Sequence, residues 1–316
     1  MLGDYDSREA CLKVAVVGAT GVIGTAAVRA MVAAGHDVVA LARSRARADL
    51  LEDLGARPVP AQLSRPDELV ALFEGSDVAC SFATRVPVGY SAALPISWRE
   101  NDRLLTDGVR AVVEAARAAG VRRVIQESVS TIYAAQGEDW INEGSPLGIT
   151  RATEPVSVGE SHVQDYQCRS RHGVVLRFGT IIGDDPRTAW LLRSVRHGRA
   201  IGTGRPDGWA HVVHTDDLGP AVLGALSAPS GVYNVGAEPV RRGDLVQGFA
   251  DAAGVERGAF LSGPAQRLLG SRMEPMTRSL RVCSEHFTAS TGWTPGRARF
   301  DASWFDVLRA ESEVLR

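Results

Sequence analysis

A short apolar strand that runs directly into evenly spaced glycines constrains this chain more than any other feature. Residues 14–17 read Val-Ala-Val-Val, and Gly18, Gly21 and Gly24 follow at the start of an Ala-rich amphipathic stretch. In this setting the first glycine permits a sharp turn, the second leaves room for a pyrophosphate, and the third lets the helix pack closely. A tight turn that binds nothing is the alternative. We predict a dinucleotide site at the helix N-terminus, with contacts from Gly18, Thr20, Gly21, Val22, Ile23 and Gly24.

Arginines follow the second apolar strand. Residues 38–42 are apolar, and the next segment, Arg43-Ser44-Arg45-Ala46-Arg47, holds no acidic residue. An acidic residue at this strand end would bind the adenosine ribose hydroxyls and repel a 2′-phosphate, whereas guanidinium groups suit a phosphate. We therefore expect NADP as the cofactor in preference to NAD, with Arg43 and Arg45 near the 2′-phosphate. A solvated basic loop is the alternative.

Apolar strands alternate with helical stretches through the first half of the chain. Strands are expected at 12–17, 38–42, 58–63, 77–84, 123–128 and 174–179, and helices at 22–34, 49–54, 66–74 and 98–119. This alternation predicts an α/β fold, a Rossmann-type doubly wound parallel sheet with a smaller C-terminal substrate lobe. We expect residues 11–180 to form the nucleotide-binding core, to which 209–236 return, and 181–208 with 237–316 to form the lobe.

Composition excludes several classes of protein. The formal net charge of −2 argues against a general nucleic-acid or anionic-membrane binder. No apolar run approaches the ~18–20 residues of a membrane span, and the N-terminal residues lack the features of a signal peptide. The cysteines are scattered without a C-x-x-C pair, so they read as reduced thiols. We expect a cytoplasmic protein that acts on a small molecule, with no metal site.

Further motifs are spread over the rest of the chain. Residues 128–133 read Ser-Val-Ser-Thr-Ile-Tyr, 176–177 read Leu-Arg, 231–235 read Gly-Val-Tyr-Asn-Val, and 291–295 read Thr-Gly-Trp-Thr-Pro. Over about residues 12–298 the chain resembles the extended short-chain dehydrogenase/reductase family, of the NAD-dependent epimerase/dehydratase type. The resemblance implies cofactor contacts near the strand ends, from Gln62, Leu63, Ala83, Thr84, Asn101 and Phe178. Gln62 stands where that family has an aspartate beside the adenine.

The resemblance fails at the catalytic pair. The family carries Tyr-x-x-x-Lys on a helix, in which the tyrosine is the acid/base and the lysine lowers its pKa and binds the nicotinamide ribose. If Glu160 matches the family's helix glutamate, the two positions are Ala152 and Val156, and no lysine follows Lys13. The pair is therefore absent rather than displaced.

Replacements for the missing pair are few. The family's hydroxyl position, four residues before Tyr133, is Val129, and Ser128 and Ser130 flank it. Both serines share one face of a strand, so either can serve, and we favour Ser128 at the strand end. Tyr133 is our first candidate for the acid/base, and Glu127 our second, because burial at a strand end would raise its pKa. Turn-capping hydroxyls, a packed tyrosine and a salt-bridged glutamate are the alternatives.

These observations favour an NADP(H)-dependent oxidoreductase of the atypical extended type, which acts on a carbonyl or alcohol of a small molecule. A sugar-nucleotide epimerase or dehydratase is one alternative, and a non-redox isomerase, cyclase or nucleotide-sensing protein is another. The long loop at 85–97 is either a substrate lid or a plain surface excursion. Arg278 or Arg281 could clamp an anionic substrate group, with simple surface exposure as the alternative. The resemblance also implies a homodimer through the helices at 98–119 and 155–171.

Overall fold

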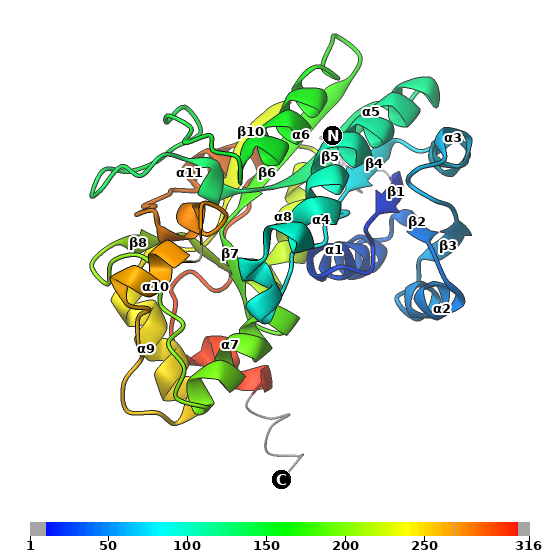
Figure 1. The fold of residues 1–316 in the computed structure, drawn as a ribbon. Helices are drawn as coiled ribbons and strands as arrows, with labels where there is room; N and C mark the ends of the chain where they lie inside the picture. Colours follow the sequence, from blue (N-terminus) through cyan, green and yellow to red (C-terminus); the bar gives the residue numbers. More distant parts are fainter. Residues whose placement is uncertain (1–10, 269, 309–316) are drawn as a thin grey trace, which may run out of the picture.

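A parallel sheet forms the centre of the computed structural model, which describes residues 11–268 and 270–308 (Figure 1). The end of the lobe expected over 237–316, namely 309–316, lies outside the described residues, as do 1–10 and 269. The sheet has seven strands in the order β10-β6-β5-β4-β1-β2-β3. These strands are β1 (Lys13–Val17), β2 (Asp37–Ala42), β3 (Arg57–Pro60), β4 (Val78–Ser81), β5 (Arg123–Val129), β6 (His172–Phe178) and β10 (Gly231–Val235). The predicted doubly wound α/β fold is confirmed.

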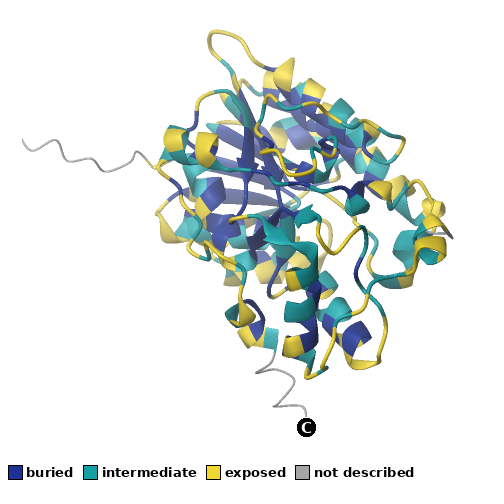
Figure 2. Cartoon of the chain, turned by 90° about the vertical axis from the view of Figure 1, so that its left-hand side faces the viewer, coloured by how far each residue is buried: buried dark blue, intermediate teal, exposed yellow. Residues whose placement is uncertain are grey.

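Helices cover both faces of the sheet, so its strands are buried on both sides (Figure 2). One face packs on α1 (Val22–Ala33), α2 (Arg45–Asp53), α8 (Thr215–Ala225) and α11 (Glu285–Thr291), and the other on α3 (Pro66–Phe73), α5 (Val109–Ala118) and α6 (Glu154–Gln164). Within β1, Val14 and Val16 join the first of these cores and Ala15 and Val17 the second. This two-sided burial explains the continuous apolar runs of the strands. Within the described part of the chain, no helix has the length and hydropathy of a membrane span.

The strand order reverses between β1 and β4. The chain runs outward from β1 to β2 and β3, then crosses to β4 and continues to β5, β6 and β10. The carboxyl ends of β1 and β4 therefore border a crevice, which is where open parallel sheets bind their ligands. The glycine turn after β1 and the segment after β4 lie at this switch point.

Several predicted elements differ from the observed ones. The helix expected at 49–54 begins four residues earlier, at Arg45, and the strand expected at 77–84 is limited to Val78–Ser81. The helix expected at 98–119 is divided into α4 (Arg99–Arg103), a π-helical turn (Leu104–Gly108) and α5. Gly159 of α6 packs against this turn so closely that a Cβ on it would lie 2.5 Å from the Leu105 carbonyl oxygen. The third strand ends at Pro60, so Gln62 and Leu63 lie in the turn that follows it.

The smaller lobe is built from paired short strands and packed helices. Its elements are β7 (Thr180–Ile182), α7 (Pro186–Arg196), β8 (Trp209–Ala210), β9 (Val212–His214), β11 (Val240–Arg241), α9 (Arg242–Ala253) and α10 (Gly263–Leu268). β7 pairs with β9, and β8 pairs with β11. Figure 1 shows α7 and α9 gathered on one side of the sheet. α11, which follows these elements in the chain, carries Phe287 into the core under the main sheet, and the expected division into core and lobe stays a prediction.

A buried ion pair joins α6 to β6. Arg177 donates to Glu160 from Nε (2.8 Å) and Nη2 (2.6 Å), and both side chains are 4% exposed. Carboxylate and guanidinium match each other in a two-point contact, which satisfies charges that would otherwise be costly to bury. Desolvation acts to lower the pKa of Arg177, but the bonds to Glu160 outweigh it and raise the pKa.

Glu160→Gln should lower the free energy of unfolding by about 3–5 kcal/mol, because it leaves the Arg177 charge buried without a counter-ion. Urea denaturation at neutral pH measures this difference. Glu238→Gln is the matched control, since Glu238 forms a 2.9 Å pair with Arg299 on the surface and exposed pairs contribute only ~0–1 kcal/mol. Equal losses in the two variants would contradict a structural role for the buried pair.

Candidate active site

The glycine turn forms an open cradle at the N-terminus of α1. Gly18 has φ 82°, and a Cβ on it would lie 2.3 Å from the backbone carbonyl carbon of Phe82 after β4. A Cβ on Gly24 would lie 2.2 Å from the Gly18 carbonyl oxygen, so this glycine lets the helix start against the turn. Gly21 is different, because a Cβ there would meet only the Gly18 oxygen at 3.4 Å. The space over Gly21 is thus free for a ligand, as a pyrophosphate site requires.

The first turn of α1 offers its backbone donors to that space. Gly21 is the N-cap and provides no side-chain hydrogen bond to the helix. The N–H groups of Val22 and Ile23 bind no backbone acceptor among the described residues, and the Thr25 N–H donates to the Gly21 carbonyl oxygen at 2.8 Å. Uncapped N–H groups at a helix N-terminus suit phosphate oxygens. The residues present therefore fit the pyrophosphate of a dinucleotide.

The arginines after β2 lie beside the cradle and differ in their partners. Arg47 donates a hydrogen bond to Thr20 of the turn. Arg45 forms an exposed 2.7 Å ion pair with Asp49. Arg43 is exposed and has no hydrogen bond or ion pair with a described residue. Arg43 is therefore the free cation of this group.

The other residues expected to contact the cofactor near the strand ends differ in how far they are exposed at the crevice. Ala83 and Thr84 follow β4 and are partly buried and exposed, respectively, at the crevice. Asn101 is buried, and its side-chain oxygen accepts the Arg85 N–H at 2.9 Å, so it holds the segment that leaves β4. Gln62 is exposed and its own N–H is bound to Glu68.

Two predicted positions carry side chains that pack against the hydrophobic cores, Leu63 partly buried and Phe178 buried. Leu63 packs against the core on the α5 side of the sheet. Phe178 is only 2% exposed and belongs to the core on the α1 side. The side chain of Phe178, the last residue of β6, therefore packs into that core, and its expected position near the nicotinamide stays a prediction.

Glu127 is the ionisable group at the carboxyl end of β5 that remains partly exposed. Burial raises its pKa to about 8, and a hydrogen bond with Thr84 offsets part of that effect. At neutral pH the carboxyl group is therefore mostly protonated and can donate a proton. The direction of this shift agrees with the expectation from sequence, whereas a catalytic role for Glu127 stays a prediction.

Ser128 and Tyr133 point into the protein interior. Ser128 Oγ donates to Glu160 Oε1 at 2.5 Å. Tyr133 is fully buried, its hydroxyl donates to Asn234 Oδ1 at 2.8 Å, and the Arg177 guanidinium lies 4.8 Å from its ring centroid. Both hydroxyls complete the network around the buried ion pair. Both hydroxyls are thus engaged by neighbouring side chains, and their assignment as catalytic groups stays a prediction.

Ser130, rather than Ser128, lines the pocket of the smaller lobe. β5 ends at Val129, and a 3-10 turn follows over Ser130–Ile132. This turn breaks the strand alternation on which the shared face of the two serines depended. Ser130 and Thr131 consequently line the pocket described below.

The positions of the missing Tyr and Lys are filled by small or apolar residues. Val156 is 8% exposed and packs with Leu105 and Ile132. Ala152 lies in the turn before α6, where its carbonyl oxygen accepts a bond from Arg272 at 3.4 Å. Arg272 is itself paired with Asp102. The side chains of Val156 and Ala152 carry neither a hydroxyl nor an amine.

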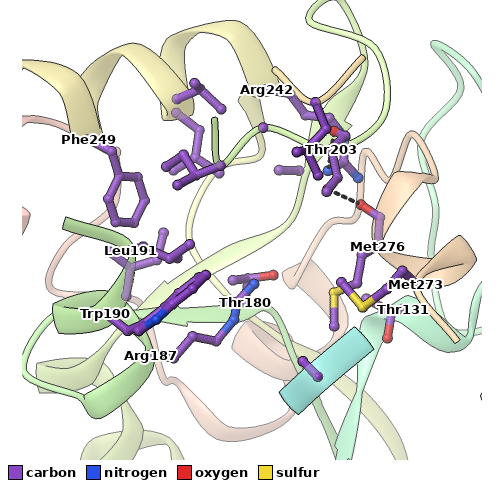
Figure 3. Close-up of a pocket in the computed structure, with 18 of the residues that line it drawn as sticks. Thr131, Thr180, Arg187, Trp190, Leu191, Thr203, Arg242, Phe249, Met273 and Met276 are labelled. Atoms are coloured by element: carbon purple, nitrogen blue, oxygen red, sulfur yellow. Dashed lines mark hydrogen bonds between the residues drawn. The ribbon is translucent and has the colours of Figure 1, made fainter. Parts of the chain in front are cut away.

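A pocket of about 280 Å³ opens between the sheet and the smaller lobe. In Figure 3, Trp190, Leu191 and Phe249 lie along one side and Met273 and Met276 along the other. The loop at 85–97 closes a further side, where Tyr90 packs edge-on against Trp190 at 5.7 Å between ring centroids. The loop thus borders the pocket, as expected of a segment at a substrate site.

The polar groups of the pocket are few. Arg187 and Thr180 lie on one side of it, and Arg242 and Thr203 on another (Figure 3). His211 also lines the pocket; it is 2% exposed, and neither ring nitrogen has a hydrogen-bond partner. Burial lowers the pKa of His211 to about 3, so the imidazole is neutral. A ligand with a polar group can supply the partner that this ring lacks.

The arginines expected to clamp a substrate do not face the pocket. Arg278 is buried, paired with Glu274 and bonded to the carbonyl oxygens of Thr131 and Tyr133. Arg281 lies over Trp140, 4.2 Å from the ring centroid. The pocket is lined instead by Arg187, Arg242 and His211. The sequence analysis did not identify these three residues as part of the site. Among the described residues there is no group of three or more His, Cys, Asp or Glu side chains that could hold a metal ion.

Comparison with known proteins identifies relatives of this architecture. Residues 18–155 match a family described as NAD(P)H-binding. A 3-diazoavenalumate denitrifying reductase from a Streptomyces species is 30% identical over 321 residues, which covers 95% of this chain and all of that protein.

Solved structures share the fold. MoeE5 in complex with UDP-glucuronic acid and NAD superposes with a TM-score of 0.74 at 23% identity, and covers 95% of this chain and 99% of its own. A UDP-glucose-4-epimerase from Stenotrophomonas maltophila with bound NAD has a TM-score of 0.74 at 20% identity, with 96% and 100% coverage.

Glu127 should make stability fall as the pH rises. Its pKa is about 8 in the folded protein and 4.5 when unperturbed, so between these values the folded state binds the extra proton and the free energy of unfolding decreases with pH. The Glu127→Gln variant should lack this decrease, so its free energy of unfolding should rise relative to that of the wild type as the pH goes from 5 to 8. Urea denaturation of both proteins across this range measures it. A constant difference between them would contradict the raised pKa.

Proposed function

Because the chain belongs to the extended short-chain dehydrogenase/reductase family, we propose that it is an NADP(H)-dependent reductase of a small molecule. The observation that carries this proposal is that two sites lie at the carboxyl ends of one sheet: a glycine cradle after β1 that fits a pyrophosphate, and an apolar pocket bordered by the residues that follow β5 and β6. Bound in the cleft, the cofactor would supply a hydride. The protein's own residues would hold the cofactor, seat the substrate and deliver any proton.

A one-way reduction suits the residues that are present. An epimerase removes a proton from a substrate alcohol and later returns it, which is the task of the Tyr-Lys pair that Ala152 and Val156 replace. Reduction of a carbonyl needs only an acid that protonates the developing alkoxide. Glu127 is protonated at neutral pH, because its pKa is about 8, and we assign it this role. Ser130 and Thr131 would orient the substrate oxygen from the pocket side.

A second candidate reaction is favoured by the absence of the proton relay and by the name of the Streptomyces relative. Replacement of a diazonium group by hydride forms a C–H bond, breaks the C–N bond and releases dinitrogen with the electron pair of that bond. No proton has to be delivered. A site without the Tyr-Lys pair can support this chemistry as well as carbonyl reduction.

Incubation with NADPH deuterated at C4 should transfer deuterium to the product of an accepted substrate, and mass spectrometry of the product detects it. Aromatic aldehydes and ketones test the first reaction, and aryl diazonium salts the second. Glu127→Gln should slow carbonyl reduction by ~10²–10⁴-fold, the usual contribution of a general acid, and leave diazonium reduction unchanged. Binding of NADPH without transfer to any of these substrates would contradict the reductase assignment.

We assign the preference for NADP to Arg43, the free cation beside the cradle. Arg43→Ala should weaken NADPH binding by ~10–100-fold, the range for a lost charge-assisted hydrogen bond, and leave NADH binding unchanged. Tryptophan fluorescence titration measures both affinities. Arg57→Ala is the matched control, since Arg57 is exposed at the opposite, amino end of β3. Equal weakening of the two nucleotides would show that Arg43 does not contact the 2′-phosphate.

The proposal keeps two expectations from the family resemblance. One is a homodimer packed through α5 and α6. The other is a cytoplasmic location, where NADPH is available and thiols stay reduced.

A further inference from the structure

The pocket lining carries positive charge without a counter-charge. Arg187 and Arg242 line it, and no Asp or Glu is among its described lining residues. His211 adds no charge, because its pKa is about 3. A cationic wall in a largely apolar cavity is costly to maintain, since charges are poorly solvated there. An anionic group on the ligand would offset that cost.

Arg187 is the arginine whose charged group is free. Its backbone N–H donates to the N-cap residue Asp185. Its guanidinium makes no hydrogen bond, ion pair or ring contact with a described residue. Other arginines near the site have acidic partners: Arg177 pairs with Glu160, Arg272 with Asp102 and Arg278 with Glu274. Burial lowers the pKa of Arg187, and the negative charge of Asp185 opposes this shift without a direct contact to the guanidinium.

Arg242 supports the same charge from another side. It donates to the carbonyl oxygens of Thr203 (3.4 Å) and Arg278, and its Nε is buried without a partner. Carbonyl oxygens satisfy hydrogen bonds but do not cancel the charge. Its guanidinium is therefore held in place while its positive field remains in the pocket.

The rest of the lining selects a flat, apolar body. The side chains of Trp190, Leu191, Phe249, Met273 and Met276 surround the space (Figure 3). At about 280 Å³ the pocket is roughly twice the ~150 Å³ cavity that accommodates benzene and at the lower limit of the ~300–1,000 Å³ of drug-sized sites. An aromatic ring with a short side chain fits these dimensions. A sugar would leave its hydroxyls against aliphatic and aromatic walls.

We propose that the substrate is a small aromatic carboxylic acid, whose carboxylate binds Arg187 while its ring lies between Trp190 and the two methionines. This inference rests on the proposed reductase function, because only that function makes the bound acid a substrate. Binding of the acid does not itself require hydride transfer. The carboxylate would place the rest of the molecule along the side of the pocket that Thr180 and Ser130 border. A phosphate of the cofactor is the other anion that could reach Arg187, and the experiment separates the two.

Titration of the full-length protein without cofactor tests the inference, with Trp190 as the fluorescent reporter in the pocket. The probes are benzoate, trans-cinnamate and 3-phenylpropionate, each beside its uncharged amide, together with UDP. Wild type should bind at least one acid more tightly than its amide. Arg187→Gln should weaken that acid by ~10–100-fold and the amide not at all, because a charge-assisted contact is lost. Arg187→Lys should retain part of the preference.

Arg193→Gln is the matched control, since Arg193 is exposed on the same helix and its loss changes the net charge equally. It should leave acid binding unchanged. Equal binding of acid and amide, or binding of UDP with none of the acids, would overturn the inference. So would an Arg187→Gln variant that loses NADPH affinity but keeps its preference for the acid. Failure of the reductase proposal would look different: acid binding would persist without deuterium transfer.

Discussion

The buried pair of Glu160 and Arg177 organises the centre of this protein. It joins α6 to β6, and both groups are almost fully enclosed, so each needs the other. The pair also attracts the neighbouring hydroxyls. Ser128 binds the carboxylate, and Tyr133 stacks beneath the guanidinium while its hydroxyl binds Asn234. A segment that resembles a catalytic motif is thereby used for structure, because a polar group next to a buried charge stabilises it.

The hydrogen-bond network around the buried pair engages two hydroxyls that the family resemblance assigned to catalysis. With Ser128 and Tyr133 turned inward and Ala152 and Val156 in place of the Tyr-Lys pair, the crevice retains a protonated Glu127 and the hydroxyls of the turn after β5. Such a set supports proton donation in one direction more readily than reversible proton exchange. This favours reduction over epimerisation, although the solved epimerases share the same fold.

The smaller lobe contributes most of the side chains that line the apolar pocket. Its α7 contributes Arg187 and Trp190, which are three residues apart and so lie on one side of the helix. Arg242 begins α9, and the methionines come from the segment after α10. A charge without a partner and an apolar surface meet in one cavity only because these elements pack together. Under the proposed function, the lobe would therefore select the molecule on which the core acts.

The sequence by itself determined the sheet, the glycine cradle and the loss of the Tyr-Lys pair. These depend on local order: apolar strands, glycines at fixed intervals, and the absence of any lysine after Lys13. The raised pKa of Glu127 was also predictable, since it requires only a strand end that is buried. The tertiary structure decided which hydroxyls and arginines face a ligand. A 3-10 turn separated Ser130 from Ser128, and acidic partners occupied Arg278 but not Arg187. Such partners come from distant parts of the chain, and their proximity is a property of packing that no local pattern records.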